Sequence, residues 1–276
     1  MRLAIFQTSP TLGSRDRNIQ AVNALLPQKI PTSRSAESRS VDLMILPELA
    51  FSGYNFQTKD DIAPYVETRT NSPSTQWAKE VAQRYGCKVL VGLPMQHELE
   101  RWNAAILVDS TGEVIHEYQK YHMFETDYRW GCSPGPGFSS TTLDVEGKPV
   151  KMSVGICMDL NPWEFKAPFS AYEYANYILQ EDISLILLPM AWLLPSTMDP
   201  ESTEPSQPTA QYWLQRLHPL IDDFKTRTVV VCNRTGRENE AVYAGTSCVF
   251  RIGQGKATLL GYLGREEGVL ELNVEV

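Results

Sequence analysis

The stretch Lys151–Pro162, KMSVGICMDLNP, decides the fold expected for this chain. Its first half is rich in apolar and β-branched residues, a composition typical of a buried strand. Cys157 is expected at the end of that strand, and Gly155 lets another group approach the backbone closely. Asn161-Pro162 suits the cap and the first position of a following helix. A thiol between a strand end and helix N–H groups has the setting of a nucleophile with a lowered pKa.

The composition of the 276-residue chain is that of a globular protein, with 42% hydrophobic and 21% charged residues. A net charge of −8 and the lack of a long basic cluster argue against nucleic acid as a partner. No apolar run approaches the roughly 20 residues of a membrane span, and the apolar run within MRLAIFQTSP is too short for the apolar region of a secretory signal. Five widely spaced cysteines fit neither a disulfide framework nor a zinc site. We therefore expect a cytoplasmic protein that binds no membrane.

Strand and helix patterns alternate along the first two thirds of the chain, and hairpins interrupt the order. Strands are expected over residues 3–8, 42–46, 88–93, 183–188, 228–232, 247–252, 258–263 and 268–274, with hairpins over 102–118 and 143–150. Helices are expected over 16–26, 73–85, from a Ser170/Glu173 capping box to Gln180, and over 211–226, where Pro219 should kink or split the helix. Surface loops are expected over 31–40 and 195–208. The pattern favours a single α/β domain over residues 1–276, with a mixed sheet covered by helices.

Three chemically active side chains each follow an apolar run: Glu48 in LMILPELAFSGY, Lys120 in EYQKYHMFETD and Cys157 in VGICMDLNP. Ligands of α/β proteins usually bind beyond the carboxyl ends of strands, so these three side chains are expected at one rim. Cys157 would then attack a carbonyl carbon, and Glu48 would pass the thiol proton to the leaving group. Lys120 and the backbone N–H of Met158 would stabilise the oxyanion. Taken singly, each residue also fits a structural role, as a solvated carboxylate, a surface charge or a small buried hydrophobe.

These blocks resemble the signatures of the nitrilase, or carbon–nitrogen hydrolase, superfamily. The matching segments are PELAFSGY, the lysine after a hairpin and GICMDLNPWEF, in the same order and spacing. The resemblance extends to the final strands and implies an α-β-β-α sandwich that hydrolyses non-peptide C–N bonds. It also implies a Glu–Lys–Cys triad, here Glu48, Lys120 and Cys157. Many members carry a second active-site glutamate soon after the lysine; Glu125 is close, and Tyr128 occupies one usual spacing.

A narrower resemblance, in KYHMFETDYRWGC and GICMDLNPWEFKAP, is to the fungal protein N-terminal amidases. That group deamidates asparagine or glutamine at a protein N-terminus and so feeds N-degron degradation. The resemblance implies that the partner is a protein or peptide N-terminus bearing Asn or Gln. Ammonia would leave as a Cys157 thioester forms, and water would then hydrolyse the thioester, without a metal or organic cofactor.

Such a substrate brings a cationic α-amino group, so the site should hold an acid that pairs with it. The acids near the triad blocks are Glu125, Asp127, Asp159 and Glu164. Asp159 is the first choice, although it fits equally well a carboxylate that accepts local backbone N–H groups. Candidates for the pocket wall are Trp130, Trp163 and Trp192, although aromatic residues at such positions more often pack in the core.

Two other functions stay open at this stage. A related hydrolase acting on a free small-molecule ω-amide or an N-carbamoyl compound would share all three catalytic residues. A catalytically silent binding protein would keep only the fold. Loss of activity on N-acetylation of the substrate would exclude the small-molecule hydrolase. Titration of an unusually reactive Cys157 thiol would exclude the silent binding protein. The Asn versus Gln preference stays open, as do a monomer and a homodimer.

Overall fold

Two six-stranded mixed sheets face each other in the computed structural model, which describes residues 1–30 and 41–276. The first sheet has the order β14-β1-β2-β3-β4-β5. Its strands are β1 (Arg2–Gln7), β2 (Leu43–Ile45), β3 (Lys88–His97), β4 (Glu100–Val108), β5 (Val114–Gln119) and β14 (Gly268–Asn273). The second sheet has the order β13-β12-β9-β8-β7-β6. Its strands are β6 (Ser140–Val145), β7 (Lys148–Val154), β8 (Leu185–Met190), β9 (Arg227–Asn233), β12 (Cys248–Gly253) and β13 (Lys256–Tyr262).

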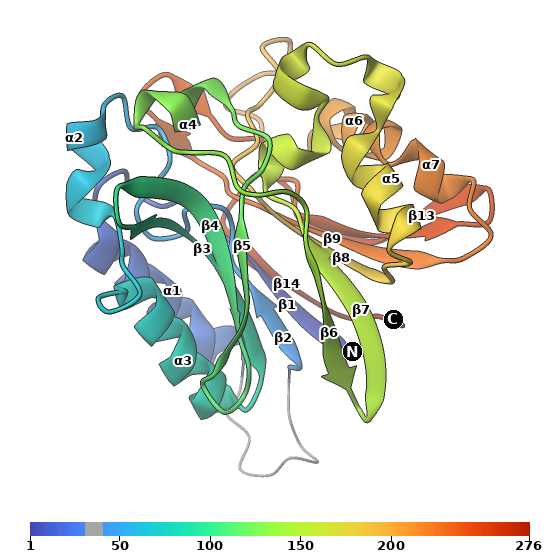
Figure 1. Ribbon diagram of the computed structural model, residues 1–276, viewed down its shortest axis with the longest axis horizontal. Helices are drawn as coiled ribbons and strands as arrows, with labels where there is room; N and C mark the ends of the chain where they lie inside the picture. The colour runs from blue at the N-terminus through green and yellow to red at the C-terminus, as the bar shows by residue number, and fades with distance from the viewer. Residues whose placement is uncertain (31–40) are drawn as a thin grey trace.

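Helices cover the outer faces of both sheets (Figure 1). The first sheet is covered by α1 (Arg15–Lys29) and α3 (Pro73–Tyr85). The second is covered by α5 (Glu173–Gln180), α6 (Gln207–Arg216) and α7 (His218–Ile221). Shorter elements are α2 (Lys59–Ile62), α4 (Glu125–Arg129), the two-stranded β10 (Arg237–Glu238) and β11 (Ala241–Val242), and the 3₁₀ turns Ala63–Tyr65, Cys157–Leu160, Trp163–Phe165 and Phe169–Ala171. The layer order is the expected α-β-β-α sandwich.

The alternation of side chains in β1 explains why the first sheet is covered on both faces. Leu3 and Ile5 join the core between the two sheets. Ala4 and Phe6, one residue further along in each case, join the core between the first sheet and its helices. Successive side chains of a strand point to opposite faces, so the continuous apolar run over residues 3–6 needs a layer on each side of the sheet.

The segment around Cys157 differs from the sequence-based expectation. Strand β7 ends at Val154, and Cys157 begins a 3₁₀ turn with a φ of 43°. Asn161 ends that turn, and only another short 3₁₀ turn follows, so the expected helix start is wrong. Gly155 does permit a close approach, because a Cβ there would lie 2.7 Å from the Tyr174 ring.

Two helix predictions need correction. Helix α5 begins at Glu173 rather than at a Ser170 cap, because the Glu173 carboxylate accepts the backbone N–H of Trp163 (3.0 Å) instead. The helix expected over 211–226 begins at Gln207 and breaks between α6 and α7, just before Pro219, as the proline predicts. The loop expected over 31–40 lies outside the described residues. Among the described residues, no helix is both long enough and apolar enough to cross a membrane.

Candidate active site

Four segments bring their polar groups to one end of the sandwich. Glu48 lies in the turn after β2, and Lys120 directly follows β5. Cys157 lies beyond β7, and Ala191 directly follows β8. Strands β2, β7 and β8 each have a parallel neighbour, so their carboxyl ends open where α/β proteins place ligands.

Glu48, Lys120 and Asp127 form a buried ionic cluster. The Lys120 Nζ donates to Glu48 Oε1 at 2.7 Å and to Asp127 Oδ2 at 2.8 Å, and all three side chains are fully buried. Asn103 bridges the two acids, since its Nδ2 donates to Glu48 at 2.6 Å and to Asp127 at 3.0 Å. The Ala191 backbone N–H donates to the other Glu48 oxygen at 2.7 Å. The glutamate is therefore held at both oxygens and has little freedom to rotate.

The charges of this cluster shift the pKa values of its members. Burial raises the pKa of Glu48 above its ordinary value, and the nearby Asp127 charge adds to this effect while Lys120 opposes it. Burial opposes the charged form of Lys120, but the carboxylates of Asp127 and Glu48 outweigh it and hold its pKa well above the ordinary value. Lys120 therefore stays cationic at working pH.

Cys157 lies beside this cluster, and the charges of Glu48 and Lys120 both act on its thiol. Burial, followed by the Glu48 charge, raises the pKa of the Cys157 thiol well above its ordinary value. The lowered pKa expected from nearby helix N–H groups is therefore wrong, because the turn is short and the thiol is desolvated. The left-handed backbone at Cys157 is strained for a residue with a Cβ, a feature that concentrates at functional sites.

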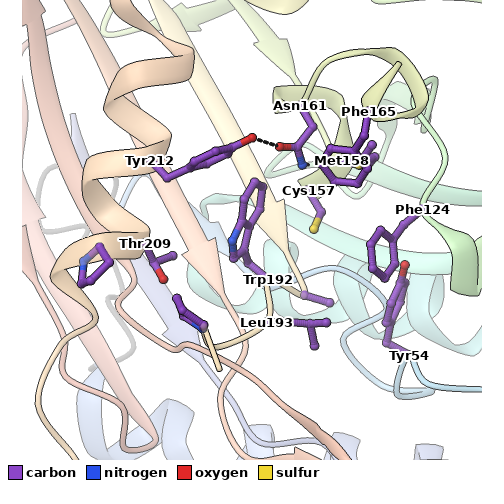
Figure 2. Close-up of a pocket in the computed structure, with 13 residues that line it drawn as sticks. Tyr54, Phe124, Cys157, Met158, Asn161, Phe165, Trp192, Leu193, Thr209 and Tyr212 are labelled. Carbon is purple, nitrogen blue, oxygen red and sulfur yellow. Dashed lines mark hydrogen bonds between the residues drawn. The ribbon is translucent and has the colours of Figure 1, made fainter. Parts of the chain in front are cut away.

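A cavity of about 470 Å³ opens over the Cys157 sulfur. Figure 2 shows the sulfur between Trp192 on one side and Phe124 with Tyr54 on the other. The cavity walls are mostly apolar and include Tyr54, Phe124, Met158, Asn161, Phe165, Ala191, Trp192, Leu193, Pro195, Pro208, Thr209 and Tyr212. The Tyr212 hydroxyl donates to Asn161 Oδ1 at 2.7 Å and fixes that side of the wall (Figure 2). The segment expected as a surface loop over 195–208 thus contributes both its ends to the cavity.

Asp159 does not face the cavity, so its expected contact with a substrate ammonium is wrong. The carboxylate is fully buried, and both oxygens accept two hydrogen bonds each. One oxygen accepts the backbone N–H groups of Tyr121 and His122 (3.1 and 2.7 Å). The other accepts the Tyr118 hydroxyl (2.8 Å) and the Ile156 N–H (2.7 Å). Asp159 therefore ties the segment after Lys120 to the turn that carries Cys157.

The remaining sequence candidates fall into three places. Asp127 contacts Lys120 rather than the cavity, so it does not face a substrate ammonium there. Trp130 is fully buried in the apolar cluster that also contains Tyr54 and Ala191, and it does not itself line the cavity. Glu125 and Glu164 line a second groove, which shares Phe124, Met158 and Phe165 with the cavity. Glu125 pairs with Arg129 there.

Three groups at the site were missed by the sequence-based reasoning: Asn103, the Ala191 N–H and Tyr54. Asn103 is the sole side-chain amide in the apolar run of β4. A buried amide needs hydrogen-bond partners, so its position in the sequence could have indicated a polar site nearby. The role of the Ala191 N–H depends on the pairing of distant strands, which the sequence does not show. Within residues 1–30 and 41–276, no group of three or more His, Cys, Asp or Glu side chains has the arrangement of a metal site.

A family model, sequence relatives and solved structures all match this chain over most of its length. The sequence model of the carbon–nitrogen hydrolase family matches residues 2–252. A Schizosaccharomyces pombe protein named protein N-terminal amidase is 36% identical, and the alignment covers 98% of both chains. The Saccharomyces cerevisiae protein of that name is 30% identical over 74% of this chain and 47% of its own length. A crystal structure of an N-terminal amidase shares the fold with a TM-score of 0.88 at 21% identity, covering 99% of this chain and 97% of that one. The same likeness holds for a structure of an N-terminal amidase with an Asn-Glu-Ala peptide.

Proposed function

Because the chain belongs to the carbon–nitrogen hydrolase family, we propose that it hydrolyses the side-chain amide of an N-terminal asparagine or glutamine. The products are ammonia and a chain that begins with aspartate or glutamate. The Glu48–Lys120 pair beside Cys157, whose side chain lines the cavity, supports the reaction class. The likeness to the S. pombe protein over nearly the whole chain supports the substrate.

The geometry supports a two-step reaction through a thioester. In the first step Glu48 accepts the Cys157 thiol proton as the sulfur attacks the carboxamide carbon, and then gives that proton to the departing ammonia. Lys120 and the Met158 backbone N–H stabilise the negative oxygen of the tetrahedral adduct. In the second step Glu48 takes a proton from a water molecule that attacks the thioester carbon. The C–S bond then breaks, and Glu48 returns the proton to the Cys157 sulfur, which releases the carboxylic acid and restores the free thiol.

The raised pKa values suit a general-base mechanism rather than a preformed thiolate. A neutral Cys157 thiol needs a base during attack, and the Glu48 carboxylate is held rigidly beside it. A carboxylate whose pKa is raised by burial is a stronger base than one in water and a competent acid toward ammonia. Asp127 holds the ammonium of Lys120 in place and acts as a positioning residue.

A groove of about 310 Å³ supports a peptide over a free small amide as the substrate. Phe124, Met158 and Phe165 line both this groove and the cavity over Cys157, so the two are continuous. The groove gives the peptide chain that follows the first residue a path outward. Glu125 and Glu164 carry carboxylates on it and are our remaining candidates for the contact with the substrate ammonium.

The proposal extends to the cellular role. A product that begins with an acidic residue would enter N-degron degradation, which requires access to cytoplasmic proteins. A cytoplasmic location also suits a reaction that depends on a reduced thiol, since such compartments keep cysteines free. The proposal is compatible with a monomer and with a homodimer.

Ammonia release tests the proposal with matched substrates. Peptides that begin with Asn or Gln should release ammonia, whereas their N-acetylated forms and free ω-amides should release far less. Cys157→Ala should abolish release, and Cys248→Ala, which removes a buried thiol from β12, should not. Equal turnover of acetylated and free peptides would reject the N-terminal specificity. Activity confined to free ω-amides would favour the small-molecule hydrolase instead.

A further inference from the structure

The Tyr54 hydroxyl is a buried polar group at the cavity wall without a hydrogen-bond partner among the described residues. The residue is 3% exposed, and its side chain lines the same cavity as Cys157. Figure 2 shows it on the wall opposite Trp192. Buried hydroxyls in proteins nearly always have a partner, because leaving one unpaired is costly. An unpaired hydroxyl at a cavity wall is therefore suited to form a hydrogen bond with an atom of the bound substrate.

Hydrogen bonds to a buried carboxylate hold the backbone around Tyr54 in place. The N–H groups of Tyr54 and Asn55 donate to the Glu238 carboxylate at 2.9 to 3.2 Å. Glu238 is in turn held by Arg234 (2.6 Å) and by the Tyr243 hydroxyl (2.7 Å). All of these groups except Asn55 are buried.

Gly53 makes this arrangement possible. Its φ of 82° is in the left-handed region, and a Cβ there would lie 2.5 Å from Glu238 Oε1. The tight turn thus allows the Glu238 carboxylate to approach the chain directly before Tyr54.

The Tyr54 ring lies against the ionic cluster. The Lys120 Nζ is 5.5 Å from the ring centroid, and the carboxylate charges of Asp127 and Glu48 act on the hydroxyl. Burial and these negative charges raise the pKa of Tyr54 well above its ordinary value, so the hydroxyl remains protonated at any working pH. It is therefore a permanent hydrogen-bond donor near the sulfur.

We propose that the Tyr54 hydroxyl donates a hydrogen bond to the carboxamide oxygen of the substrate as that oxygen becomes negative. This inference rests on the proposed amide hydrolysis and adds a third donor to Lys120 and the Met158 N–H. Tyr54 transfers no proton; its hydrogen stays on the phenolic oxygen throughout. Because the bond strengthens with the charge on the oxygen, it acts on the transition state more than on the bound substrate.

Tyr54→Phe tests the proposal, with Tyr85→Phe as the matched control. Tyr85, in α3, also has a buried hydroxyl without a partner in the described part of the chain, and it does not line the cavity. For Tyr54→Phe we expect kcat to fall about 100-fold, with KM within about twofold of wild type. Tyr85→Phe should change neither constant. An unchanged kcat in Tyr54→Phe, or an equal loss in both variants, would overturn the proposal.

Alkylation of Cys157 gives a second readout that needs no turnover. Iodoacetamide carries a carboxamide, whereas methyl methanethiosulfonate does not. We expect Tyr54→Phe to slow modification of Cys157 by iodoacetamide about 3- to 10-fold and to leave the methanethiosulfonate rate unchanged. An equal change in both rates would mean that Tyr54 acts on the thiol itself, and would overturn the proposal. This comparison remains valid even if wild-type protein releases no ammonia from any peptide, a result that would reject the proposed function alone.

Discussion

The substitution Asp159→Asn tests whether the Asp159 carboxylate stabilises the fold or contacts the substrate. The carboxylate accepts four hydrogen bonds, three of them from backbone N–H groups. An asparagine of the same shape places an NH₂ group where one oxygen was. The Tyr118 hydroxyl can turn to accept from that group, but the Ile156 N–H cannot. At least one buried backbone donor therefore loses its acceptor in either orientation of the amide.

The expected change in the free energy of unfolding follows from the number of hydrogen bonds that Asp159→Asn loses. A hydrogen bond to a charged acceptor contributes about 1.5–3 kcal/mol, and an unsatisfied buried donor costs about 1–3 kcal/mol. Burial raises the pKa of Asp159, which means that its negative charge is costly in this position. The neutral asparagine avoids that cost, and this offsets part of the stability lost with the hydrogen bonds. We expect a net loss of about 2–4 kcal/mol in the free energy of unfolding. For a chain of this size that corresponds to a decrease in Tm of roughly 5–15 °C.

Thermal and urea unfolding measure this loss, and Asp109→Asn is the matched control. Asp109 accepts its three hydrogen bonds, from Thr111 and Glu113, through a single oxygen, which an asparagine carbonyl can replace. Its Tm should therefore stay within about 2 °C of wild type. If Asp159→Asn kept the wild-type Tm and raised KM for peptides with a free amino group, Asp159 would be a substrate contact, and the structural assignment would be refuted.

Three further predictions concern the ionic cluster. Glu48→Gln keeps the side-chain shape but removes the base, so kcat should fall about 10²- to 10⁴-fold in a protein that unfolds cooperatively; a near-normal kcat would rule out Glu48 as the base. Because burial raises the pKa of Glu48 above 4.5 and only its ionised form accepts the Cys157 proton, kcat/KM should fall on the acid side with an apparent pKa above 4.5. A pH–rate profile that stays flat below that value would contradict this. Asp127→Asn leaves the Lys120 ammonium with one buried carboxylate instead of two, which should cost up to about 3–5 kcal/mol in urea unfolding; a loss below about 1 kcal/mol would show that the pair contributes little.

Local patterns in the sequence are sufficient for most of the fold. The apolar run of β1 predicts a buried strand, and its two faces do pack against different layers. Pro219 predicts a break in the helix, and α6 and α7 separate there. Both features depend on neighbouring residues, so the sequence contains the necessary information.

The site itself was only partly predictable. Glu48, Lys120 and Cys157 each follow a strand, and the polar residue after an apolar run is visible in the sequence. The role of Asp159 is not, because two of its donors, the N–H groups of Tyr121 and His122, come from a segment that the fold brings to it. The raised pKa of Cys157 likewise depends on burial and on the Glu48 charge from another strand.

Mass spectrometry of the protein quenched in acid during turnover tests the central claim most directly. With a peptide that begins with Asn, Cys157 should carry an adduct of the peptide mass less that of ammonia. The adduct should be absent from Cys157→Ala and should disappear as the substrate is consumed. Ammonia release by Cys157→Ala at the wild-type rate, with no adduct on Cys157 in the wild-type protein, would contradict the thioester mechanism.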